Sequence, residues 1–120
     1  MRTIILLLFA GYSSIAHSYS GNELLARLNS DDAYDKTHIY GYVHAILDNN
    51  FLSYEVEKFW ANKENRTFLF GRFVCPPPSH NVGQAADIIK KYLETNPERR
   101  HEGAAYLSYF ALLQAWPCRE

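Results

Sequence analysis

Apolar residues recur at helical spacing along much of the chain, most clearly between residues 81 and 95. Asn81 precedes this stretch and is a good N-cap, with Ser79 as an alternative start. Asn96-Pro97 ends it and opens a fresh turn over residues 98–100. The apolar positions share one face, and they are Val82, Ala85, Ala86, Ile89, Tyr92 and Leu93. The pattern predicts an amphipathic helix with a wet polar side.

Residues 104–116 form a second kind of pattern, because they are apolar almost all round. Only Ser108 and Gln114 are polar in this stretch, and Pro117 ends it. A helix that is apolar on every face is expected to be buried, and this one is too short to span a bilayer. The sequence therefore predicts a central helix around which the others pack.

Two further helices are predicted in the N-terminal half, over residues 22–28 and about 33–49. The core stripe of the second consists of Ile39, Val43, Ile46 and Leu47. Gly41 and Ala45 are four residues apart, a spacing that permits another helix to approach closely.

An acidic cluster precedes the second of these helices. It consists of Asp31, Asp32 and Asp35. Negative charge suits a helix N-terminus, whereas a calcium loop needs a more regular set of oxygens. We interpret the cluster as a turn and helix cap.

The pattern of residues 51–74 fits two kinds of secondary structure. Residues 53–61 fit a third helix with Val56, Phe59 and Trp60 facing inward, followed by a loop and an extended segment over 67–74. The rival is a short β-hairpin around 52–74 that turns at the polar run 62–65. The fold class predicted is mainly α: a small bundle of four or five short helices.

The N-terminus has the features of a secretory signal. Arg2 is followed by the apolar run 4–10, and Ala16-His17-Ser18 supplies small residues at the spacing that signal peptidase needs, with Ser18-Tyr19-Ser20 as a second candidate. We expect residues 1–18 to be cleaved, which leaves 19–120 as a single exported domain without a membrane anchor.

Cys75 and Cys118 are the two cysteines of the chain. An exported protein meets an oxidising compartment, so we expect them to form a disulfide that staples the bundle. Closing a loop of this length contributes roughly 4 kcal/mol on the chain-entropy model. The alternative is two free, buried thiols.

The block from Cys75 to Cys118 also has a distinctive series of motifs. They are Cys75-Pro76, Gln84, residues 88–93, Asn96-Pro97-Glu98, Arg100-His101, Ala104-Ala105 and residues 115–118. Upstream stand residues 40–43, which read Tyr-Gly-Tyr-Val, and Asp48. Together these resemble the Rap/Tai family, periplasmic immunity proteins against cell-wall amidase effectors of type VI secretion systems.

The resemblance implies a periplasmic protein that binds a cognate peptidoglycan amidase and needs no cofactor. Members of the family are described as homodimers that occlude the effector's active site with a protruding loop. This chain departs from many members in two respects. Two further cysteines, whose places fall near Leu28 and at Ile39, are absent, and the segment between Asp48 and Cys75 is longer.

Catalytic and metal-binding patterns are weak. A Cys75–His80 pair would need a free thiol, and His44 with Asp48 supplies too few ligands for a metal. The formal net charge of −1 gives no reason to expect nucleic acid. We expect a binding protein and no enzyme. The rivals are a small helical periplasmic chaperone of the acid-stress kind and a small secreted enzyme.

Two connections are candidate partner-binding sites, because inhibition of a buried cleft needs a protruding element. The first is formed by Lys63, Glu64, Asn65 and Arg66, and the second by Ser79, His80 and Asn81. Aromatic residues make up 15% of the chain, and several lie between residues 59 and 73. They belong either to the core or to a dimer or partner surface.

Overall fold

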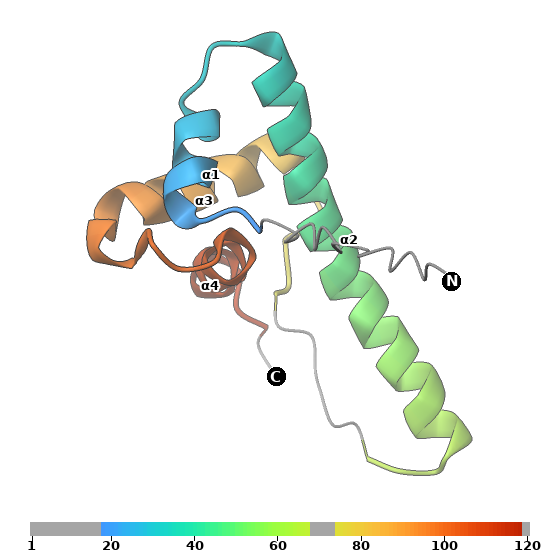
Figure 1. Ribbon diagram of the computed structural model, residues 1–120. Coiled ribbons are helices and arrows are strands. Elements are labelled where there is room, and N and C mark those ends of the chain that lie inside the picture. Colours follow the sequence, from blue (N-terminus) through green and yellow to red (C-terminus); the bar gives the residue numbers. More distant parts are fainter. Residues whose placement is uncertain (1–17, 68–73, 119–120) are drawn as a thin grey trace, which may run out of the picture.

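The computed structural model describes residues 18–67 and 74–118, and within them the chain is helical. The elements are α1 (Gly21–Leu28), α2 (Ala33–Lys63), α3 (Val82–Thr95), the 3-10 turn η1 (Pro97–Arg99) and α4 (Ala104–Ala115). Figure 1 shows the arrangement: α1, α3 and α4 gather around one half of the long helix α2. The predicted fold class, mainly α, is confirmed.

The long helix α2 replaces two predicted elements. It runs without a break for 31 residues, through Asn49 and Asn50, where the sequence suggested an end. Because residues 52–63 are helical, the first strand of the rival hairpin is wrong. Residues 68–73, the rest of the predicted extended segment, lie outside the described residues.

The core lies where α1, α3, α4 and the first half of α2 meet. Its buried apolar side chains include the predicted stripes of α2 and α3 apart from Leu47 and Val82, which are partly buried, together with Leu24, Leu107 and Leu112. Leu25, Leu28 and Leu47 pack against its edge. Amphipathic spacing therefore identified the core-facing side of each of these three helices.

The helix α4 is buried on one side only, so the predicted all-round burial is wrong. Leu107, Ala111 and Leu112 are buried, whereas Tyr106 and Leu113 are 54% and 38% exposed. Ser108 lies in the core, and its buried hydroxyl has no hydrogen-bond partner among the described residues. The small domain has too few elements to cover every face of α4.

Backbone hydrogen bonds hold the start of α1 against the turn that leads into α4. The amides of Gly21 and Asn22 donate to the carbonyls of Glu102 and Arg100, and the amide of Ala104 donates to Tyr19. The approach is close: a Cβ on Gly21 would lie 2.6 Å from Cδ1 of Leu107. This contact requires glycine at position 21.

Side-chain caps fix the helix ends, as predicted for α2 and α3. Asp32 caps α2 by accepting from the amides of Tyr34 and Asp35. Asn81 caps α3 and forms a reciprocal capping box with Gln84. Asn96 ends α3, as its position before a proline predicted.

The predicted disulfide is present. Cys75 and Cys118 are bonded, with a Cα–Cα distance of 4.9 Å. Beside it, Val74 forms an isolated bridge with Pro117, and the amide of Cys75 donates to the carbonyl of Trp116. The end of α4 is thus tied to the chain that leads into α3.

Asn50 fixes the same segment to the middle of α2. Its side-chain amide donates to the carbonyl of Val74 at 2.9 Å, and its carbonyl oxygen accepts from the amide of Val74 at 3.2 Å. Asn50 is buried. The chain therefore leaves α2 after Lys63 and comes back to the level of Asn50.

None of the described helices is both long enough and apolar enough to cross a membrane.

Candidate protein-binding surface

The second half of α2 extends away from the rest of the domain. We call residues 51–67 the arm. In Figure 1 it points away from α1, α3 and α4 and ends in the turn that follows Lys63. Within the arm only Ala61 is buried, and it shares a face of the helix with Asn50 and Glu57. The arm is thus the protruding element of the described structure.

The arm exposes a set of large apolar side chains. They are Phe51, Leu52, Val56, Phe59 and Trp60, with exposed fractions between 43% and 60%. The prediction that Val56, Phe59 and Trp60 face inward is wrong. Leu52, Val56 and Phe59 lie on the side of the helix opposite to Asn50 and Ala61. A group of exposed apolar residues of this size is typical of an interaction surface.

The tip of the arm is a polar turn held by ion pairs. Arg66 contacts Glu57 at 2.7 Å and Glu64 at 2.6 Å, and its amide donates to the carbonyl of Ala61. The hydrogen bonds that the guanidinium of Arg66 donates, first to Glu57 and then to Glu64, raise the pKa of Arg66, so its positive charge is permanent. Asn65 has a φ of 48°, a conformation that asparagine tolerates better than most residues.

Lys63 completes the tip. Its ammonium lies 4.8 Å from the centre of the Trp60 ring, which also packs edge-on against Phe59. The structure therefore brings together the first predicted set, Lys63, Glu64, Asn65 and Arg66, at the end of the arm. A turn with this many internal contacts is pre-organised, so less conformational entropy is lost when it binds.

A pocket of about 420 Å³ lies at the base of the arm, between α2 and α4. Its lining consists of Asn49, Asn50, Ser53, Tyr106, Tyr109, Phe110 and Leu113. The hydroxyl of Tyr109 donates to the carbonyl of Ile46 and accepts from the side-chain amide of Asn49. These bonds hold the aromatic wall of the pocket in place.

The second predicted set lies elsewhere, in the turn before α3. The side chain of Asn81 is committed to its cap. His80 contacts the carbonyl of Pro77 at 2.8 Å through Nδ1 and packs edge-on against Trp116. Ser79 is exposed. Figure 1 shows this turn near the middle of α2 and away from the tip of the arm, so the two sets do not form one surface.

Comparison with known proteins supplies the family. The protein-family model of the Rap1a immunity proteins matches residues 20–118 of the chain. No curated protein and no solved structure matches the chain. The matched stretch spans α1 to the disulfide and includes the arm.

The chain belongs to the Rap1a immunity protein family. Rap1a proteins are non-enzymatic inhibitors, so the expectation of a binding protein is confirmed. Cys75 is bonded to Cys118 and cannot pair with His80 as a nucleophile. In the described ranges, no group of three His, Cys, Asp or Glu residues is placed to hold a metal ion.

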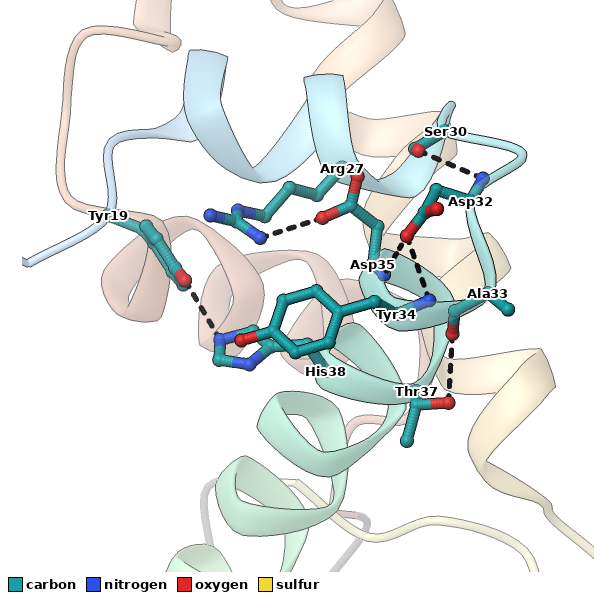
Figure 2. A network of polar contacts seen from close by, with 9 residues as sticks. All are labelled: Tyr19, Arg27, Ser30, Asp32, Ala33, Tyr34, Asp35, Thr37 and His38. Atoms are coloured by element: carbon teal, nitrogen blue, oxygen red, sulfur yellow. Dashed lines mark hydrogen bonds and ion pairs between the residues drawn. The ribbon is translucent and has the colours of Figure 1, made fainter.

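A polar network joins α1 to the start of α2 in this Rap1a protein (Figure 2). Arg27 pairs with Asp35 at 2.8 Å, and its guanidinium lies over the ring of Tyr19. The hydroxyl of Tyr19 contacts Nε2 of His38 at 2.8 Å. Within the acidic cluster, Asp32 thus supplies the cap and Asp35 the ion pair that joins the two helices.

Sequence reasoning missed two features of the surface. The exposure of the arm was missed because apolar residues at helical spacing look the same whether the chain itself or a partner covers them. The role of Asn50 was missed because an Asn-Asn pair is usual at helix ends. The stretch between Asp48 and Cys75, which contains none of the motifs that carry the family resemblance, was the available signal, and it spans the whole arm.

Proposed function

We propose that this Rap1a protein neutralises a peptidoglycan amidase that a type VI secretion system delivers to the periplasm. The observation that carries the proposal is the family match over residues 20–118, which implies a cognate effector of such a system. The amidase as target follows from the resemblance of the C-terminal motifs to the Rap/Tai family.

The proposal includes export. Residues 1–18 serve as a cleaved signal peptide, and residues 19–120 act in the periplasm as a homodimer. The disulfide supports this location, since such bonds persist in oxidising compartments.

The tip of the arm is the proposed inhibitory element. An amidase cleaves its substrate in a cleft, and a narrow, pre-organised turn on a helical support is suited to enter one. Lys63, Glu64, Asn65 and Arg66 offer charges of both signs and an exposed turn. Ser79, His80 and Asn81 are the second candidate contact, because Ser79 and Asn81 are also exposed.

The test is a protection assay in cells that express the cognate amidase in the periplasm. The tip variant replaces residues 63–66 with Gly and Ser at constant length. The matched control replaces Asp87, Lys91 and Glu94 with Ser, because these charged residues are exposed on α3. We expect the wild type and the control to protect, and the folded tip variant to lose protection and most of its affinity.

Two outcomes contradict parts of the proposal. A folded tip variant that binds the amidase with unchanged affinity would exclude the tip and direct attention to residues 79–81. A wild-type protein that neither binds nor inhibits any periplasmic amidase of its own secretion system would overturn the function itself.

A further inference from the structure

The exposed face of α2 is complementary, in charge and in apolar character, to the same face of a helix that runs in the opposite direction. Asp48, Leu52, Val56, Phe59 and Lys63 are spaced by four, four, three and four residues, so they share one side of the helix. All five are exposed. We call them the exposed stripe. It is apolar in the middle, negative at one end and positive at the other.

This order suits an antiparallel pair. If the same helix of a second copy runs in the opposite direction, with the two-fold axis near residues 55 and 56, Asp48 of each copy comes level with Lys63 of the other. Leu52 then comes level with Phe59 of the second copy, also twice. A parallel arrangement would place like charges together at both ends. The charges and apolar residues are thus complementary to themselves, as a two-fold symmetric interface requires.

The pocket at the base of the arm supports the same register. Asn49 and Ser53 of α2 form one wall of it, and Tyr106 and Leu113 of α4 lie on the other side. In the antiparallel register, the Phe59–Trp60 end of one copy reaches the level of residues 51 and 52 of the other, beside this pocket. The arm would thus supply an aromatic residue, and its base an apolar pocket about 420 Å³ in volume to receive it.

The exposed area is appropriate for a dimer. Phe59 and Trp60 are each about half exposed, which leaves on the order of 200 Å² on these two rings alone. A stable interface buries about 800 Å² on each partner. Leu52 and Val56, with Tyr106 and Leu113 beside the pocket, add to the apolar centre, and Asp48 and Lys63 form its polar rim.

We propose that the exposed stripe of α2 binds the same stripe of a second copy in an antiparallel arrangement, with the aromatic end of each arm against the pocket at the base of the other. This assignment of a face and a register deepens the proposed function, on whose homodimer it rests. In this register the two tips lie at opposite ends of the paired arms, and Lys63 of each tip faces Asp48 of the other copy.

The experiment measures the mass in solution of the oxidised, exported protein by light scattering and sedimentation across a concentration series. Phe59→Asp and Leu113→Glu each place a charge in the seam, on different elements, and we expect each to raise the dimer dissociation constant at least 100-fold. Tyr40→Asp is the matched control, since Tyr40 is 46% exposed but lies off the stripe. It should leave the dimer intact.

Reversal of the rim charges tests the register. Asp48→Lys and Lys63→Asp each put like charges together twice, so each should weaken the dimer by on the order of tenfold. The double variant restores opposite charges with their positions exchanged and should recover most of that loss. These surface changes decide the matter even if circular dichroism shows that Phe59→Asp is not folded.

Three outcomes would overturn the proposal: a wild-type monomer at all concentrations, a folded Phe59→Asp or Leu113→Glu variant that stays dimeric, or a double reversal that does not recover. None of them depends on protection against the amidase. A monomer that protects would refute the seam and leave the immunity function, whereas a dimer that fails to protect would do the reverse.

Discussion

Asn50 is a buried polar residue halfway along α2, and it determines where the chain returns after the arm. Its side chain forms one hydrogen bond to the amide of Val74 and one to its carbonyl. It thus acts like a short piece of β-ladder within a helical protein. The contact spans 24 residues of sequence.

Replacement of Asn50 with Leu should destabilise the fold markedly. Both backbone groups of Val74, which is 1% exposed, would lose their partner, and a buried unpaired group costs about 1–3 kcal/mol. We expect the free energy of unfolding to fall by roughly 2–5 kcal/mol in urea titrations. Asn49→Ala is the control, since Asn49 is exposed, and it should cost about 1 kcal/mol. Equal effects of the two variants would refute the role of Asn50.

Single residues were predictable from sequence where the signal is local. The cap by Asn81 was predicted, as was a cap from the acidic cluster, which Asp32 supplies, because a cap depends on residues within one turn of it. The contact between Asn50 and Val74 was not, since nothing near either residue indicates its distant partner. For the same reason, the tip was predicted as a connection, whereas the ion pair from Arg66 to Glu57 was not.

At the scale of elements, α1 and α2 contain glycines with opposite roles. Gly21 allows α1 to approach η1 and α4, where a Cβ would meet Leu107 at 2.6 Å and the carbonyl of Arg100 at 3.0 Å. Gly41 faces open space, because a Cβ at this position of α2 would meet no neighbouring atom within 4 Å. The predicted close approach of another helix at Gly41 does not occur within the described chain.

Replacement of these two glycines with alanine should therefore change the free energy of unfolding in opposite directions. Gly21→Ala should destabilise the protein by roughly 1–3 kcal/mol, because backbone lies on one side of the new methyl group. Gly41→Ala should stabilise it by about 1 kcal/mol, the difference in helix propensity. Thermal and urea unfolding of the two variants check this. A destabilising Gly41→Ala would reveal a contact at that position in the assembled protein.

The elements themselves were predicted best where one face is polar. In α1 and α3 the alternation of apolar and polar residues gave both the extent and the buried side. In α4 and in the arm the apolar residues exceed what one core can cover. Periodicity then says nothing about which of these apolar residues the fold buries. The helix end predicted near Asn49 was wrong because the tertiary contacts of Asn50 favour a continuous helix.

At the scale of the molecule, two links join the two ends of the arm segment at its base. Asn50 and Val74 meet at its base, and the Cys75–Cys118 disulfide lies one residue further along. These two links therefore close the core, which α1, α3, α4 and the first half of α2 form, and leave the arm outside it.

Loss of the disulfide should weaken that core. The bond joins residues 43 apart in sequence, and its removal in a Cys75→Ser, Cys118→Ser variant should cost roughly 4 kcal/mol on the chain-entropy model. Urea titrations with and without reductant measure it. The wild type should shift on reduction to the stability of the variant, and the variant should not shift. Two alkylatable thiols in native exported protein would contradict the prediction.

Because the arm leaves and re-enters the fold at one junction, its length can change independently of the core. Whole helical turns can be added or removed between Asn50 and Val74 without moving either end, since loop closure grows only with the logarithm of length. On the proposed role of the tip, recognition of a new effector calls for changes in the arm, and the residues that fold the core stay as they are.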